Sequence, residues 1–327
     1  MVVKQLIKLF IFIAGCSVLV NAAPAYSADA AYPNRPVTII VPFPPGGLTD
    51  NLGRLIADQL SGKLKQSFIV ENKPGAGTLL AAQQVAKDKP DGYRLMVATT
   101  TTLSISPALY KHTKFRSNQL TGVAMLGNVT LILVARPNFP ANTAVELVGL
   151  AKKNPGKYTF ASPGSGTGHH LLMELLKSHE KLNITHIPFQ GSPTAMTSVM
   201  SGRVDFMFLD AAIATPQIKA GKLKALAVSG STRLDTLPNV PPITDSFPFM
   251  NLQIWQSIAA PANTPKAIVA LLNKNINGLL KIPAFRKKLA DIGLQANPMS
   301  VDALNQFLKK DEAGWADIIK KSGSQVD

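Results

Sequence analysis

The sequence predicts an α/β protein made of two similar units, each a β-sheet covered by helices. Three observations carry this prediction. Short apolar, β-branched runs alternate with stretches of helical spacing from Pro36 onward, the alternation restarts near Leu131, and no flexible linker separates the two series. The chain has 327 residues, of which 46% are hydrophobic and 16% charged, so it has enough apolar material for two cores.

The first series has the order strand, helix, strand, helix, strand. Val37–Val41 is a five-residue β-branched run that stops at Pro42. The next apolar runs cover residues 68–70 and 95–98, and the intervening residues 50–60 and 78–87 have apolar positions at helical spacing. Since this order is that of strands joined by crossover helices, we expect a parallel sheet covered on both faces.

The second series begins at residues 131–134. It predicts further strands over 158–161, 184–187, 204–208 and 225–228, and helices over 145–153, 169–178 and 194–200. The chain after Trp255 is predicted to be mostly helical, over 265–280, 283–292 and 301–320. Two α/β units without a linker predict closely apposed lobes, with ligands beyond the carboxyl ends of the strands.

The N-terminal segment has the features of a secretory signal. Lys4 and Lys8 precede an apolar stretch over residues 9–20, and small residues on either side of Tyr26 predict cleavage near Ala28. The apolar run is shorter than the roughly 20 residues of a bilayer span. We therefore assign residues 1–27 to a signal peptide and expect export to the periplasm.

Cys16, the only cysteine, lies inside this segment. Residues 13–16 resemble a lipoprotein processing box, which would give a lipid-anchored protein. The apolar run continues past Cys16, however, where a lipoprotein usually turns polar. We expect a soluble mature chain without cysteine, which excludes disulfides and thiol catalysis.

The chain is strongly basic, with a net charge of +15 that falls to +13 without Lys4 and Lys8. Its lysines are scattered, and the densest pairs are typical of solvated helix faces. Only 6% of the residues are aromatic, so stacking on nucleic acid bases is not expected. The charge favours steering of small anions, and we expect no nucleic acid partner.

Two glycine-rich loops each join a predicted strand to a predicted helix. The first, residues 42–50, contains the adjacent Gly46 and Gly47, and the second covers residues 161–170. Glycines let backbone amides approach a ligand closely, and the start of a helix is a natural anion site. An ordinary loop with Asp50 as helix cap is the alternative. Neither loop completes a nucleotide-binding motif, so we expect no cofactor.

Ser165 and His170 in the second loop raise the alternative of nucleophilic catalysis. The glycines around Ser165 have the wrong spacing for a nucleophile elbow, and no third catalytic partner stands at a recognisable spacing. His169 and His170 are adjacent and point to different helix faces, so they do not form a metal site. One of the two is expected to bond a ligand or to cap the turn.

The same loops belong to a longer set of motifs. It comprises Pro42-Phe43-Pro44-Pro45-Gly46-Gly47 and the segments 70–77, 91–93, 164–171, 186–191, 202–205, 221–228 and 237–241. In this order, the set resembles the receptors of tripartite tricarboxylate transporters, the Bug family of periplasmic solute receptors. The resemblance implies a two-lobed type II periplasmic-binding-protein fold, a Venus flytrap with a crossed hinge. Lobe one would comprise residues 28–132 and 254–327, and lobe two residues 133–253.

The resemblance also implies a site in which backbone amides and bridging waters from both lobes hold a carboxylate. The corresponding positions of lobe one are Phe43, Gly46, Gly47 and Asp50, to which we add Thr99 of the hydroxyl-rich loop 99–102. Those of lobe two are Ser165, Thr167, His170, Gln190, Gly191 and Asp210.

Two of these positions, Gln190 and Asp210, and the neighbouring Phe189 depart from what the resemblance or a carboxylate ligand would require. Phe189 and Gln190 stand where the family usually has tyrosine and often lysine, which predicts a less polar and less basic rim. Asp210 would repel a carboxylate unless it meets a ligand ammonium, hydroxyl or protonated group. The alternative role for Asp210 is to cap the following helix.

These observations predict a receptor rather than an enzyme. It would bind a small organic carboxylate (a di- or tricarboxylate, an aromatic carboxylate or an acidic amino acid) between its lobes and deliver it to the membrane permease subunits of a secondary transporter. We expect a monomer without metal or cofactor. The alternatives are a periplasmic hydrolase or transferase using Ser165 and His170, and a sensor subunit that binds the same ligand.

Overall fold

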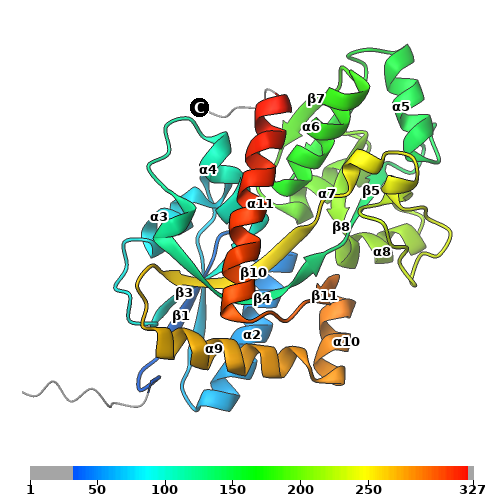
Figure 1. The fold of residues 1–327 in the computed structure, drawn as a ribbon. Helices are drawn as coiled ribbons and strands as arrows, with labels where there is room; N and C mark the ends of the chain where they lie inside the picture. Colours follow the sequence, from blue (N-terminus) through cyan, green and yellow to red (C-terminus); the bar gives the residue numbers. More distant parts are fainter. Residues whose placement is uncertain (1–31, 323–327) are drawn as a thin grey trace, which may run out of the picture. The chain divides into compact units, whose positions relative to one another are not determined.

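The computed structural model describes residues 32–322, so the predicted signal peptide and Cys16 lie outside the described residues. Two separate β-sheets form the centre of the described chain (Figure 1). The first sheet has the order β11-β4-β10-β3-β1-β2. Its strands are β1 (Val37–Val41), β2 (Phe68–Asn72), β3 (Arg94–Thr99), β4 (Leu120–Val129), β10 (Ile254–Pro261) and β11 (Leu294–Ala296).

The second sheet has the order β7-β6-β8-β5-β9. Its strands are β5 (Leu131–Ala135), β6 (Thr159–Ser162), β7 (Thr185–Pro188), β8 (Phe206–Asp210) and β9 (Lys224–Val228). Thr130 alone joins β4 of the first sheet to β5 of the second, and the chain returns from β9 to β10 over residues 229–253. The expected lobe boundaries at 132 and 253 remain a prediction, although β5 already begins at Leu131.

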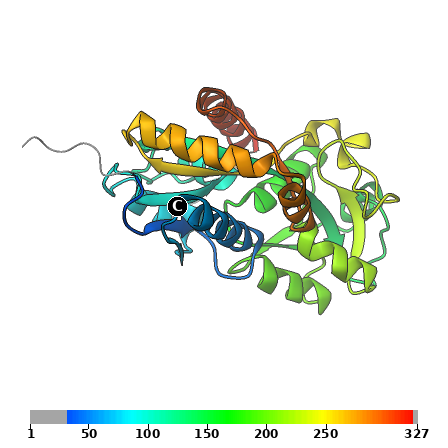
Figure 2. The ribbon, with the colours of Figure 1, turned by 90° about the horizontal axis from the view of Figure 1, so that it is seen from below.

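Helices cover both faces of each sheet. In the first lobe, α2 (Leu48–Leu64) and α9 (Lys266–Leu280) pack side by side on one face (Figure 2), while α3 (Leu79–Val85) and α11 (Val301–Ser322) contact the strands and turns of the other. Two further helices are α4 (Ser106–Leu109) and α10 (Pro283–Asp291), and the short turns are η1 (Ala76–Thr78), the π-helical η2 (Thr101–Ile105) and η3 (Ser117–Gln119).

The second sheet has α6 (Gly168–Glu180) on one face and α7 (Ser192–Met200) with α8 (Ala211–Lys219) on the other. The remaining elements of this region are α5 (Ala144–Lys153), η4 (Ile243–Asp245) and η5 (Pro248–Met250). Each sheet has a core of its own. Ile40, Met96 and Trp255 belong to a cluster in the first, and Ile132 and Met207 to a cluster in the second.

The α/β prediction is confirmed, and the three strands of the first series are parallel as expected, while strands outside that series make both sheets mixed. β1 pairs in parallel with β2 and β3, whereas β10 runs antiparallel to β3 and β4. In the second sheet β6 is parallel to β7 and β8, and β5 is antiparallel to β8 and β9. These antiparallel pairs involve β5 and β10, the strands that follow the two crossings of the chain between the sheets. No α-helix lies in either connection, whereas a parallel pair is usually joined by a crossover helix.

Candidate functional site

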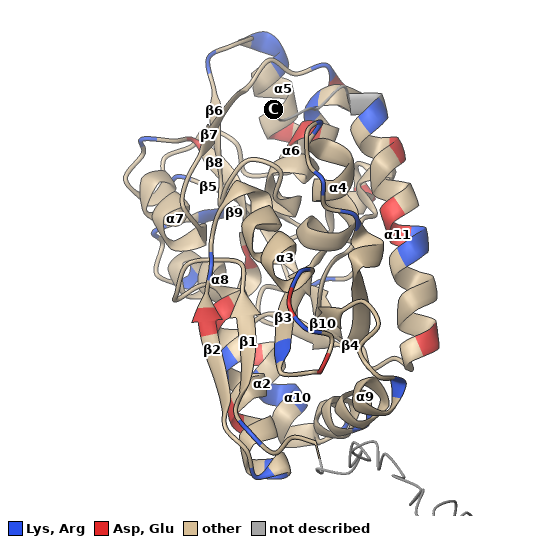
Figure 3. Ribbon diagram, turned by 90° about the vertical axis from the view of Figure 1, so that its left-hand side faces the viewer, with Lys and Arg blue, Asp and Glu red and all other residues tan. Residues whose placement is uncertain are grey.

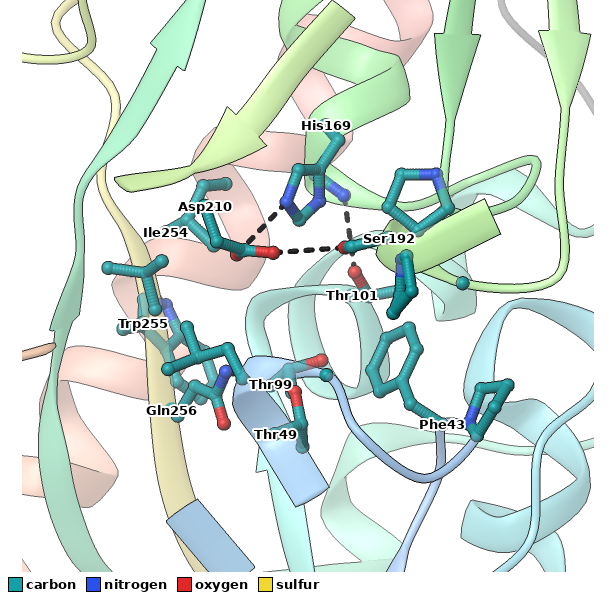
Figure 4. Close-up of a pocket in the computed structure, with 18 residues that line it drawn as sticks. Phe43, Thr49, Thr99, Thr101, His169, Ser192, Asp210, Ile254, Trp255 and Gln256 are labelled. Atoms are coloured by element: carbon teal, nitrogen blue, oxygen red, sulfur yellow. Dashed lines mark hydrogen bonds and ion pairs between the residues drawn. The ribbon is translucent and has the colours of Figure 1, made fainter. Parts of the chain in front are cut away.

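A pocket lies where the carboxyl ends of β1, β3, β6 and β8 face each other, closed on one side by the start of β10 (Figure 4). Its empty volume, which includes the mouth, is about 570 Å³. The position agrees with the rule that ligands of α/β sheets bind beyond the carboxyl ends of the strands.

Five of the predicted site residues line this pocket: Phe43, Gly47, Thr99, Gly191 and Asp210. The other six are not part of its wall: Gly46, Asp50, Ser165, Thr167, His170 and Gln190. The prediction also missed polar residues that do line the pocket, namely Thr49, Thr101, His169, Ser192 and Gln256.

The two adjacent glycines of the first loop have different roles. Gly46 has a φ of +86°, so the turn itself requires glycine. Gly47 has an ordinary φ of −86° and precedes α2, and a side chain added to it would meet nothing within 4 Å. Gly47 is therefore not required by the fold; it keeps the pocket beside the start of α2 open.

Asp50 braces this loop from behind instead of facing the pocket. Its carboxylate accepts hydrogen bonds from the Gly46 amide (3.0 Å), from Arg54 Nε (3.1 Å) and from Asn72 Nδ2 (2.8 Å). Asn72 Nδ2 also donates to the Phe43 carbonyl at 3.0 Å. Burial alone would raise the pKa of Asp50, but these donors outweigh it and hold the pKa below its usual value.

The second glycine-rich loop begins α6 with a capped turn. Thr167 Oγ1 accepts from the His170 amide at 3.4 Å, and the Gly168 amide donates to Thr101 Oγ1 of the first lobe at 3.2 Å. A second bond between the lobes joins the Tyr110 hydroxyl to the Ser165 carbonyl at 3.4 Å. Thr167 and Ser165 thus shape the loop and its contact with lobe one.

His170 is turned away from the pocket and packed in the second lobe. Its Nδ1 accepts from the Gly166 amide at 3.2 Å, and its ring stacks on that of His186 with centroids 4.0 Å apart. Burial, His186 and Lys177 lower the pKa of His170 to about 3. Of the two adjacent histidines, His170 supports the turn, and His169 is the one that reaches the pocket.

Asp210 joins three loops of the second lobe at the pocket wall. It is buried, and it accepts hydrogen bonds from Ser192 Oγ at 2.9 Å and from His169 Nε2 at 3.2 Å (Figure 4). Burial alone would raise its pKa, but His169 and Ser192 outweigh burial and lower it. The alternative role for Asp210, a side-chain cap of the following helix, is wrong, because its carboxylate makes no capping hydrogen bond to α8.

Three helices begin at this pocket: α2, α6 and α7. The amides of Leu48, Thr49, His169 and Ser192 lie in their first turns, and no hydrogen bond of the described residues uses them. Such amides lack intrahelical partners and carry the positive end of the helix dipole. Among the described residues that line the pocket, none is lysine or arginine. The pocket therefore offers an anion backbone amides rather than a lysine or arginine side chain.

Gln256 on β10 supplies an unusual group. It is only 4% exposed, and its Nε2 donates to Thr49 Oγ1 at 3.0 Å. Its Oε1 has no hydrogen-bond partner among the described residues. The sequence did not suggest this residue, because every position of β10 is buried and the strand lacks the alternation of polar and apolar residues that marks a half-buried strand.

The comparisons with known proteins agree with this geometry. Residues 52–324 match the model of the tripartite tricarboxylate transporter family receptor. The chain belongs to that family. Receptors of this family bind solutes and are not enzymes, so the hydrolase alternative is wrong.

Three solved structures illustrate the similarity. The R. palustris protein Rpa4515, solved with adipate, is 28% identical with a TM-score of 0.86, covering 90% of this receptor and 100% of that chain. The periplasmic binding protein BugD is 33% identical with a TM-score of 0.84, covering 90% and 99%. MatC from Rhodopseudomonas palustris, with bound malate, is 32% identical with a TM-score of 0.82, covering 88% and 100%. The two-lobed fold expected for the receptor is confirmed.

The geometry around Ser165 agrees with a receptor that performs no catalysis. His170 Nδ1 is occupied by the Gly166 amide, and Ser165 contacts Tyr110 through its carbonyl. Among the described residues, no group of three His, Cys, Asp or Glu side chains could hold a metal ion. No helix within residues 32–322 is both long and apolar enough to cross a membrane.

Proposed function

We propose that this receptor captures a small organic carboxylate in the pocket between its lobes and delivers it to the permease subunits of a tripartite membrane transporter. The observation that carries the proposal is the convergence of unpartnered amides from α2, α6 and α7 on one pocket. Hydrogen bonds from amides to a carboxylate are charge-assisted, and each contributes about 1.5–3 kcal/mol. Several such donors bind an anion without a buried lysine or arginine.

Two of the similar proteins support the class of ligand. Rpa4515 was solved with adipate and MatC with malate, both dicarboxylates. In this receptor, Phe43, Pro44 and Ile254 add an apolar part to the polar wall. An apolar surface beside anion-binding amides suits an acid with a short carbon skeleton.

The charge of the chain supports the capture of an anion. The net charge is +15 for the whole sequence, and Figure 3 shows lysine and arginine residues spread over several elements on the side that it draws. Scattered positive charge raises the local concentration of anions without creating a single docking patch. The receptor would act in the periplasm as a monomer, with the signal peptide removed.

Calorimetric titration of the purified receptor with adipate, malate, succinate and citrate tests the capture. At least one acid should bind, and adipamide, the uncharged counterpart of adipate, should not. Leu48→Pro removes one amide at the first position of α2, where a helix tolerates proline. Leu48→Ala is the matched control, because it loses the same side-chain packing but keeps the amide.

Leu48→Pro should bind the acid about tenfold more weakly than Leu48→Ala, which is the loss of roughly one charge-assisted bond. Equal affinities of the two variants, or no binding of any acid, would contradict the proposed site. Delivery to a transporter is tested by measuring the uptake, in cells that lack the receptor, of the acid that binds in calorimetry. Unchanged uptake in those cells would favour the sensor alternative over transport.

A further inference from the structure

The unpartnered oxygen of Gln256 has a consequence for the kind of acid that binds. A buried polar atom without a hydrogen bond is costly, about 1–3 kcal/mol, and native proteins rarely leave one. Gln256 Oε1 is such an atom, on a side chain that is 4% exposed and lines the pocket. An oxygen accepts hydrogen bonds and repels a carboxylate, so its natural partner is a donor on the ligand.

The two acceptors Asp210 and Gln256 stand on β8 and β10, next to the starts of the helices whose amides are free. Figure 4 draws Asp210, Ile254 and Gln256 on one side and Phe43 of the loop before α2 on the other. The strand pairings give the reason. Asp210 pairs with Leu131 next to the passage at Thr130, and Gln256 pairs with Gly127 just before it. The side of the pocket nearest Thr130, where the chain crosses between the lobes, therefore presents the side-chain oxygens of Asp210 and Gln256.

The donor on the ligand is expected to be uncharged. Gln256 carries no charge, and the two oxygens of Asp210 already accept hydrogen bonds from His169 Nε2 at 3.2 Å and Ser192 Oγ at 2.9 Å. A ligand ammonium at Oε1 would therefore lose its hydration against an uncharged acceptor. A hydroxyl needs only one acceptor and fits the Oε1 atom.

We propose that Gln256 Oε1 accepts a hydrogen bond from a hydroxyl group of the ligand, so that the receptor selects hydroxycarboxylates over the same acids without the hydroxyl. This inference rests on the proposed capture of a carboxylate in the same pocket. The carboxylate lies toward the starts of α2, α6 and α7, and the hydroxyl toward β10.

Matched acids test the selection by calorimetric titration. Malate and succinate differ by one hydroxyl, as do 2-hydroxyadipate and adipate, and both enantiomers of each hydroxy acid are measured. In the wild-type receptor one hydroxy acid should bind at least about tenfold more tightly than its partner, since the partner leaves Oε1 unpaired. Aspartate, which places an ammonium where malate has its hydroxyl, should bind more weakly than malate.

Two variants of Gln256 test whether its side-chain oxygen is the source of the selection. Gln256→Met removes the acceptor, and the ratio of the two affinities should fall to within about threefold of unity. Gln256→Glu keeps an acceptor, so it should keep the ratio while weakening both acids by charge repulsion. Thermal unfolding verifies that each variant is folded, and the Glu variant keeps the test valid if the Met variant is not.

Each other outcome overturns the inference. Equal binding of hydroxy and plain acids by the wild type would refute the selection and leave carboxylate capture standing. An equal loss for both acids in Gln256→Met would mean that the amide nitrogen faces the carboxylate. Tighter binding of aspartate than of malate would assign a charged donor to this position. If no acid binds, the proposed function itself fails and the inference with it.

Discussion

The stacked histidines of the second lobe should make the stability of the receptor depend steeply on pH. The pKa of His170 is lowered to about 3 by burial, His186 and Lys177, and that of His186 to about 4 by burial and Lys177. Both rings are also held by hydrogen bonds. Nδ1 of His170 accepts the Gly166 amide and so must be unprotonated, and Nε2 of His186 lies 2.7 Å from Ser162 Oγ.

The direction of this pH dependence follows from comparing the folded and unfolded states of the chain. Unfolded, each histidine returns to a pKa of 6.5, so the unfolded chain takes up protons below that pH while the folded protein does not. Acid therefore favours unfolding, at about 1.4 kcal/mol per pH unit for each histidine once the unfolded chain is protonated. From pH 7 to pH 5 the free energy of unfolding should fall by about 4 kcal/mol for the pair. The loss ends near pH 4 for His186 and near pH 3 for His170.

Urea unfolding at pH 5, 6 and 7, followed by circular dichroism, measures this loss. His186→Phe keeps an aromatic ring in the stack but removes one titrating group, so it should lose only about half as much stability. His112→Asn, at an exposed position, is the control and should lose as much as the wild type. A wild-type stability that is flat between pH 7 and pH 5, or an undiminished loss in His186→Phe, would refute the reasoning.

Three further predictions concern the pocket. Gly47→Val should weaken acid binding at least about tenfold in calorimetry. Its Tm should stay within about 2 °C of the wild type, because the added Cβ meets no protein atom within 4 Å. Gly46→Val should instead lower the Tm, since the φ of Gly46 is +86°. Asp50→Ala should cost about 1–3 kcal/mol in urea unfolding and weaken binding without touching the ligand; unchanged affinity would show that the loop does not need this brace. Trp255 is fully buried, lines the pocket and donates from Nε1 to Asp311 at 2.8 Å, so acid binding should change its fluorescence, and Trp315→Phe should keep that change.

The sequence alone determined the elements whose pattern is local. Val37–Val41 forms β1 as predicted, because a β-branched run ended by Pro42 has few other conformations. The helices after Trp255 were predicted within a few residues, since an amphipathic face repeats at helical spacing. The glycine-rich loops were identified for the same reason: their residue types are themselves the signal, and both reach the pocket through Gly47 and Gly168.

The tertiary structure decided which side chains meet. Whether His169 or His170 faces the pocket depends on where α6 begins, and the contacts of Thr167 and Gly168 with Gly164 and Thr101 fix that start. Sequence reasoning placed Asp210 at the site but could not choose its role, because its partners Ser192 and His169 come from two other loops.

Gln256 lay beyond sequence reasoning for a related reason. Its neighbours in the chain form a strand that is buried throughout, so no alternation marks the position. That its oxygen lacks a partner follows only from the arrangement of β10 against α2 and the pocket. The local pattern of residues determines the backbone conformation of a segment. The pairing of polar atoms depends instead on contacts between residues far apart in the chain, and no local pattern shows which of these residues meet.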